Sequence, residues 1–229
     1  MRSSIGIKQH NICPPHLINF LKKFFSLSEW KGLYLTGGTA LSEYYLGHRS
    51  SVDIDLFTNA EELFRSAISI FQDKKIWKQE QIKVMRSFPR FVSALIHFPA
   101  GEPVKLDLVH DIPVRLGEPV QFDKIWIDDL PDIASNKITC LISRQEIKDF
   151  VDIYFLFPEL GWNVEKWVEN GNKKDGGLAP FILSSCIEWI YQVEAIPHFM
   201  KKTINWGDFH KFWQKFQKDL MELEPRPAI

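Results

Sequence analysis

Two aspartates at alternate positions, Asp53 and Asp55, are the residues of this 229-residue chain whose types and spacing most directly suggest chemistry. In an extended strand their Cα atoms lie about 6.5 Å apart and their side chains share one face, so both carboxylates can reach one metal ion. The pair follows a glycine turn, Gly37-Gly38. Free backbone amides at such a turn suit a polyphosphate. The stretch therefore predicts a metal-dependent enzyme that acts on a nucleoside triphosphate (NTP).

A third carboxylate, Asp107, is predicted on the polar face of another strand. Residues 104–109 alternate apolar side chains with Lys105 and Asp107. Three carboxylates can hold two Mg²⁺ (or Mn²⁺) ions, or one ion and a base, as nucleotidyl or phosphoryl transfer requires. A bare Asp-x-Asp pair is more often a solvated strand face. The glycine turn and the third aspartate favour function, with Asp53, Asp55 and Asp107 as catalytic metal ligands.

The predicted phosphate-binding wall consists of Gly37, Gly38, Thr39, Arg49 and Ser51. Thr39 either caps the helix that follows the glycines or contacts a phosphate oxygen. Arg49 either clamps a phosphate or pairs with the acidic strand. Ser51 either contacts a phosphate or metal-bound water, acts as a nucleophile, or is only a strand-entry serine. Spacing alone leaves these alternatives open.

Lys137 is a cation on an otherwise apolar helix face. A charge in that position is costly unless it is paired. Two compatible interpretations follow: a buried pair with Asp149 or Asp152, or an ammonium directed at the triphosphate. We therefore include Lys137 and Asp149 among the candidate catalytic residues.

The elements that must position these residues predict an α+β fold, a small mixed sheet flanked by helices and followed by a helical C-terminal region. Proline and glycine cluster through residues 113–119, which suggests a catalytic core at 1–120 and a mainly helical region at 121–229 that completes the active-site cleft. Asp128 or Asp129 is expected to cap the first helix of that region. Strands are expected at 33–36, 52–57, 91–98 and 104–109, an irregular strand at 82–85, helices at 16–25, 39–46, 59–71 and 145–157, and a loop at 170–177.

Composition limits the class of protein. Hydrophobic residues make up 45% of the chain, which supports a substantial core, and the net charge of −1 gives no global attraction to nucleic acid. Three widely spaced cysteines fit a reducing compartment better than a disulfide framework. The N-terminus has no apolar run and no segment is long enough to span a membrane, so we expect a cytoplasmic protein.

Three ordered motifs together resemble the AbiEii/AbiGii-type nucleotidyltransferase toxins of the DNA polymerase β-like superfamily. The first is the stretch from Gly37 to Phe57, the second is Val104-Lys105-Leu106-Asp107, and the third runs from Asp132 through Lys137, Arg144 and Asp149 to Leu156. The resemblance covers roughly residues 33–157, and the order of the motifs makes it specific.

The resemblance implies Mg²⁺-dependent transfer of a nucleotide from an NTP to an acceptor, with RNA (the tRNA 3′ end) as the expected acceptor. It places Asp53 and Asp55 at the metal, Ser51 and the glycine turn at the phosphates, and makes Lys137 and Asp149 (or Asp152) necessary for activity. It implies the toxin of a type IV-like toxin–antitoxin or abortive-infection system with a cognate antitoxin. The alternatives are a protein nucleotidyltransferase, a phosphotransferase or phosphatase using Asp53, or a non-catalytic nucleotide sensor.

Overall fold

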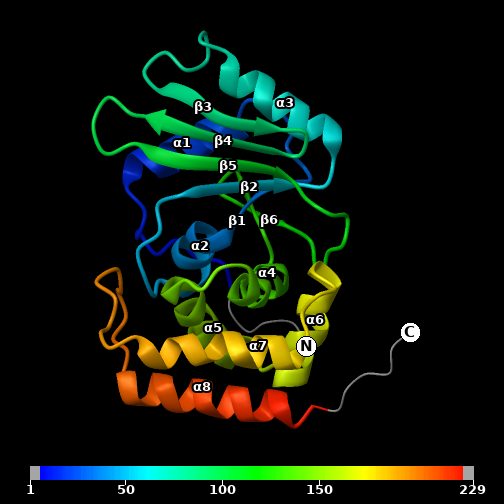
Figure 1. The fold of residues 1–229 in the computed structure, drawn as a ribbon. Coiled ribbons are helices and arrows are strands. Elements are labelled where there is room, and N and C mark those ends of the chain that lie inside the picture. The colour runs from blue at the N-terminus through cyan, green and yellow to red at the C-terminus, as the bar shows by residue number, and fades with distance from the viewer. Residues whose placement is uncertain (1–5, 224–229) are drawn as a thin grey trace. The chain divides into compact units, whose positions relative to one another are not determined.

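Alternating apolar residues form a mixed sheet of seven strands in the order β3-β4-β5-β2-β1-β7-β6 (Figure 1). The computed structural model describes residues 6–223. Two strand pairs, β2–β5 and β1–β7, are parallel, and the other pairs are antiparallel. The predicted α+β class with a mixed sheet is confirmed. The strands are β1 (Leu33–Thr36), β2 (Ile54–Thr58), β3 (Gln81–Phe88), β4 (Phe91–His97), β5 (Val104–His110), β6 (Val120–Phe122) and β7 (Ile125–Ile127).

One face of this sheet is the core of the first compact unit, Ile7–Asp129. Ile54, Leu56, Leu106 and Leu108 point to that face and are fully buried. The helices α1 (Pro15–Phe25) and α3 (Glu61–Gln72) cover it, and they pack against each other through stacked aromatic rings. Alternation along the strands leaves the opposite face to polar side chains. The candidate site lies on that polar face.

The chain between β1 and β2 differs from the prediction. A helix was expected to start after the glycines, but α2 (Gly37–Ala40) begins at Gly37 itself and continues as a π-helix, η1 (Leu41–Leu46). The predicted stop at Gly47 is confirmed, since this residue ends η1 in the left-handed conformation. The strand β2 begins at Ile54, so Asp53 lies just before it rather than within it.

Other predicted elements of the first unit agree with the structure. The hairpin of β4 and β5 and the helix α1 are confirmed. The irregular strand expected at 82–85 is the eight-residue β3, which has a bulge between Val84 and Arg86. The strands β6 and β7 were missed, because each has only three residues and they adjoin a stretch rich in proline and glycine.

The second unit begins at Leu130 and, within the described residues, is helical. The helix α4 contacts α5, α6 and α7, and α8 contacts α6 and α7. Trp167 and Trp213 are fully buried in this packing. The loop expected at 170–177 was wrong in its first half, because α6 continues to Lys174 and buries Asn170. The elements are α4 (Leu130–Ser143), α5 (Ile147–Leu160), α6 (Val164–Lys174), α7 (Pro180–Ile187), the 3₁₀ helix η2 (Glu188–Gln192) and α8 (Trp206–Met221).

Across residues 6–223, none of the helices has both the length and the apolar character that a bilayer span requires.

Candidate active site

A row of polar side chains crosses the polar face of the sheet at one register. Asp55 of β2 lies directly opposite Asp107 of the parallel strand β5. Thr36 of β1 lies opposite Asp55, and Ser93 of β4 lies opposite Asp107. Residues paired in this way point to the same face, with strands about 4.8 Å apart. The two strand carboxylates predicted to act together are therefore neighbours in space.

The negative charge of this row shifts the pKa of Lys105. Its ammonium donates to Asp107 Oδ2 at 2.6 Å, while Ser93 Oγ donates to Asp107 Oδ1 at 2.6 Å. Partial burial works to lower the pKa of Lys105. The hydrogen bond and charge of Asp107, with the charges of Asp55 and Asp53, outweigh burial and raise that pKa above its ordinary value. All three predicted carboxylates thus act on one cation, and Asp53 belongs to the same cluster although it precedes the strand.

The donor set of this cluster fits a divalent cation. Asp53, Asp55 and Asp107 supply carboxylate oxygens, the ligand type that Mg²⁺ prefers. Asp53 is exposed and the other two are partly exposed. Gly37 has a φ of +70°, and a Cβ added to it would lie 2.3 Å from Asp55 Oδ2. A side chain at this position would displace the Asp55 carboxylate, so the close approach of the backbone to that carboxylate requires glycine.

The second glycine brings the backbone against two predicted phosphate-binding residues. A Cβ added to Gly38 would lie 2.5 Å from Arg49 Nη2 and 2.8 Å from Ser51 Oγ. Arg49 is almost fully buried and its Nη1 donates to the Ser50 carbonyl at 3.0 Å. The structure thus brings Gly38, Arg49 and Ser51 together. Their contact with a phosphate stays a prediction.

Thr39 has a different position from the cap considered above. It lies inside α2, and the N-cap position belongs to Thr36, so the capping interpretation was wrong. Its hydroxyl donates to the Asp53 carbonyl at 2.5 Å and lies 3.1 Å from Ser51 Oγ. Thr39 therefore holds the segment that carries Ser51 and Asp53 against the helix. A direct contact with substrate stays a prediction.

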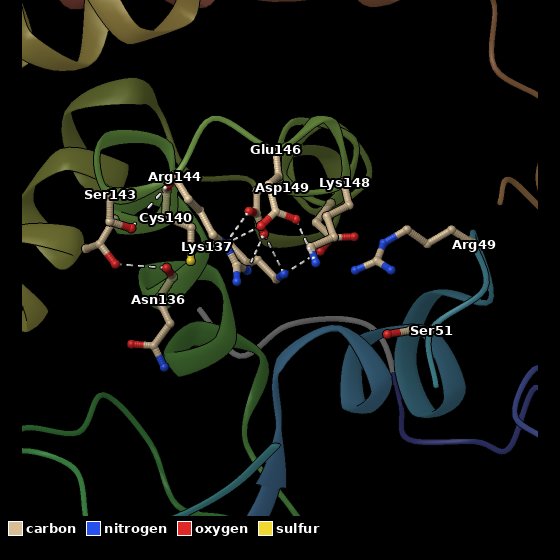
Figure 2. Close-up of polar contacts among 12 residues, drawn as sticks. Arg49, Ser51, Asn136, Lys137, Cys140, Ser143, Arg144, Glu146, Lys148 and Asp149 are labelled. Atoms are coloured by element: carbon tan, nitrogen blue, oxygen red, sulfur yellow. Dashed lines mark hydrogen bonds and ion pairs between the residues drawn. The ribbon is translucent and has the colours of Figure 1, made fainter. Parts of the chain in front are cut away.

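In the second unit, Lys137 is bound by two buried carboxylates. Its ammonium lies 2.8 Å from Asp149 Oδ1 and 2.6 Å from Asp152 Oδ2. Arg144 contributes a second cation to Asp149, with its Nε 2.9 Å from Oδ2 and its Nη2 3.1 Å from Oδ1 (Figure 2). Lys137 is 4% exposed, and both aspartates are 0% exposed. The predicted buried pair is confirmed, and it includes both candidate carboxylates. That Lys137 also contacts a triphosphate stays a prediction.

These charges shift the protonation of their neighbours. Burial works to lower the pKa of Arg144, but the hydrogen bond and charge of Asp149 outweigh it and raise that pKa further. Burial, with the charge of Asp149, raises the pKa of the Cys140 thiol. Cys140 is therefore a neutral thiol at neutral pH. The four charges of Lys137, Arg144, Asp149 and Asp152 sum to zero.

Sequence reasoning missed the role of Asp128. Asp128 or Asp129 was expected to cap a helix, and the buried carboxylate of Asp128 has two long-range partners besides: it accepts a 2.6 Å hydrogen bond from Thr36 Oγ1 and forms a 2.7 Å ion pair with Arg115. Tyr45 donates to its carbonyl at 2.7 Å. Because Thr36 lies opposite Asp55, this contact extends the polar row by one more carboxylate. The position directly after an apolar strand, Ile125–Ile127, was the signal available in the sequence.

Comparisons with known proteins identify the family of this chain. The model of a family described as nucleotidyl transferase AbiEii toxin, type IV toxin–antitoxin system, matches residues 19–229. An uncharacterized protein of Aquifex aeolicus (strain VF5), aq_aa25, is 31% identical over 155 residues, which are 67% of this chain and 71% of that protein.

Solved structures share the fold at low sequence identity. A candidate nucleotidyltransferase from H. pylori is 17% identical, with a TM-score of 0.55 over 92% of this chain and 96% of its own. JHP933 from Helicobacter pylori is 15% identical, with a TM-score of 0.54 over 90% and 91%. The nucleotidyltransferase toxin MenT4 from Mycobacterium tuberculosis H37Rv is 12% identical, with a TM-score of 0.52 over 91% and 83%.

Proposed function

Because the chain belongs to the AbiEii nucleotidyltransferase toxin family, and is on that basis a nucleotidyltransferase, we propose that it moves a nucleotide from an NTP to a hydroxyl of RNA, with the tRNA 3′ end as the acceptor. The acceptor hydroxyl loses its proton to solvent and its oxygen forms a bond to the α-phosphorus. The bond from the α-phosphorus to the oxygen that bridges the α- and β-phosphates breaks, and pyrophosphate leaves. The observation that carries this proposal is the in-register pairing of Asp55 and Asp107 on the polar face of the sheet.

The carboxylates of Asp53, Asp55 and Asp107 would hold Mg²⁺ or Mn²⁺. When bound, the metal neutralises phosphate oxygens and lowers the pKa of an attacking hydroxyl. The close packing of Gly37 on Asp55 supports this assignment, because any larger residue would displace the carboxylate from its place in the cluster.

The remaining candidates would bind the triphosphate. The backbone amides at Gly37 and Gly38 present donors to phosphate oxygens. Arg49 and Ser51, which lie against Gly38, add a cation and a hydroxyl at the same place. Lys137, held by Asp149 and Asp152, would contribute a further positive charge. The proposed roles of these residues rest on the family and on their chemistry.

Transfer of label tests the proposal directly. The purified protein is incubated with Mg²⁺, bulk tRNA and each α-labelled NTP in turn, and RNA and protein are separated. We expect label in RNA with a preferred NTP. Asp55→Asn should reduce transfer by at least about 100-fold, because it removes a charge that holds the metal. Asp111→Asn, which changes a carboxylate outside the row, is the matched control.

Other outcomes of this experiment distinguish the alternatives. Label in the protein itself would identify a protein nucleotidyltransferase. NTP binding without transfer to any acceptor would identify a nucleotide sensor. In cells, expression of the wild-type chain should arrest growth, Asp55→Asn should not, and co-expression of a cognate antitoxin should restore growth.

A further inference from the structure

The edge strand β3 carries cations that have no ion-pair partner among residues 6–223. β3 is the terminal strand of the sheet (Figure 1). Lys83, Arg86 and Phe88 are exposed, and Phe88 keeps 60% of its surface accessible. The whole chain has a net charge of −1, so these two exposed cations form a local positive patch beside a large exposed ring.

A bulge sets the direction of these side chains. Lys83 pairs with Leu95, but the register shifts between Val84 and Arg86, so Arg86 pairs with Ser93. Ser93 in turn lies opposite Asp107. Without the extra residue, Met85 would lie opposite Ser93 and Arg86 would point to the other face. The bulge therefore places both cations on the face that carries Asp55 and Asp107, the acidic row. Bulges near functional sites often redirect a side chain in this way.

Aromatic rings occupy the same face beside the cations. Phe88 pairs with Phe91, two residues before Ser93, and the two rings stack at a centroid distance of 6.4 Å and an interplanar angle of 26°. Phe88 is the more exposed of the two rings, so one aromatic face is available to a partner. Stacked aromatic rings next to Lys and Arg are the surface that single-stranded nucleic acid binds.

We propose that the β3–β4 strip, defined as Lys83, Arg86, Phe88 and Phe91, binds the single-stranded end of the nucleic-acid acceptor. A base stacks on Phe88, and backbone phosphates contact Lys83 and Arg86. Arg86 lies two strands from Asp107, about 10 Å. This distance lets one strand pass from the strip to the acidic row. The inference rests on the proposed transfer to RNA and specifies which surface of the enzyme receives that substrate.

A protein strand is the alternative occupant of this edge. An exposed edge strand can pair with a strand of another protein or a second copy of the chain. Charged side chains on the edge oppose such pairing, and the cations point to the face rather than to the partner strand. Charge complementarity with phosphate and the position of the acidic row on the same face favour nucleic acid.

Binding of a fluorescein-labelled single-stranded RNA, followed by anisotropy across a salt series, tests the strip. Lys83→Ala/Arg86→Ala should make the slope of log affinity against log salt shallower by about 0.7 for each cation removed. Phe88→Ala should weaken binding roughly tenfold or more while the slope stays the same. Lys74→Ala/Lys75→Ala is the matched control, because these exposed lysines follow α3, which covers the opposite face.

Two further measurements separate the possible failures. If the wild-type chain transfers no label to RNA, the proposed function fails. If it transfers label but the strip variants keep wild-type RNA affinity, salt slope and KM for RNA, the strip proposal alone is overturned. A fluorescent NTP analogue should bind the strip variants normally. Concentration-dependent dimerisation that the strip variants abolish, without RNA binding by the wild type, would assign the edge to strand pairing and also overturn the proposal.

Discussion

The Lys137 side chain lies inside the protein between two carboxylates with no exposed surface. A buried ion pair is held at a desolvation cost that good geometry and further hydrogen bonds offset. Here Arg144 supplies two of those hydrogen bonds to Asp149. Removal of a single charge from such a network leaves another charge buried and unpaired. The stability of α4 against α5 and the proposed phosphate contact therefore depend on the same side chain.

Lys137→Met should lower the free energy of unfolding by about 3–5 kcal/mol, because it leaves the two buried aspartates with too little positive charge. The double variant Lys137→Met/Asp152→Asn restores neutrality and should recover most of that loss, as measured by urea denaturation. Transfer should stay absent in both variants, because the ammonium is missing.

A surface lysine of the same helix pair provides the control. Lys148→Met removes a cation that pairs with exposed Glu146, and it should change stability by less than about 1 kcal/mol. If the double variant regains transfer together with stability, Lys137 acts only through packing, and its proposed role at the triphosphate is wrong.

Single residues were predictable where local chemistry constrains them. The charge of Lys137 on an apolar face implied a buried carboxylate partner, and the structure has two. The contact between Asp128 and Thr36 was missed because the two residues lie 92 positions apart in sequence, and no local pattern encodes it. Seen from the local sequence alone, an aspartate just before a helix fits a helix cap.

At the scale of elements, the α2–η1 helix positions the site through its glycines as well as through the Thr39 hydroxyl. Gly37 and Gly47 both have positive φ, at the start of α2 and after the end of η1. A Cβ at either would lie 2.3 Å from a side-chain atom, Asp55 Oδ2 for Gly37 and His10 Nδ1 for Gly47. The two positions thus impose similar strain on different neighbours.

This similarity gives a matched pair of variants. Gly37→Ala and Gly47→Ala should each cost about 1–2 kcal/mol of stability from the left-handed backbone, measured by denaturation. Gly37→Ala should also lower transfer by about 100-fold, because it displaces the Asp55 carboxylate. Gly47→Ala should transfer at nearly the wild-type rate. Equal activity losses in both variants would show that the effect is general destabilisation.

Elements with strong periodicity were predictable, and elements built by distant pairing were not. The spacing of Leu17, Phe20, Leu21 and Phe24 predicted α1, and alternation predicted β4 and β5. The strands β6 and β7 depend on pairing with each other and with β1, which three-residue strands do not reveal. The bulge in β3 likewise exists only in relation to β4.

For the whole molecule, fold persists where sequence identity does not. The solved structures cover 90% or more of this chain at 12–17% identity. Such conservation of fold requires a buried pattern rather than particular residues, because apolar cores accept many substitutions of similar volume. The first unit, Ile7–Asp129, buries an aromatic-rich core of this kind, and so does the helical region from Leu130.

Ligand linkage should report the site through global stability. An NTP with Mg²⁺ at about 100 times its Kd should stabilise the protein by about 2.7 kcal/mol, which corresponds to a Tm increase of roughly 5–10 °C for a chain of this size. Differential scanning fluorimetry measures the shift. Chelation of the metal with EDTA should remove it, and so should Asp55→Asn. An unchanged shift in EDTA would show that nucleotide binding does not require a divalent cation.

The pairing of Asp55 with Asp107 has a consequence for how such chains change over time. Like charges directly opposite on adjacent strands repel one another, and Lys105 offsets this only in part because it is half-exposed. Replacing either carboxylate by its amide removes the repulsion, and it should also abolish the proposed nucleotide transfer. Selection against a harmful enzyme can therefore silence it by one substitution without loss of fold. Inactive descendants of this chain should keep the sheet intact.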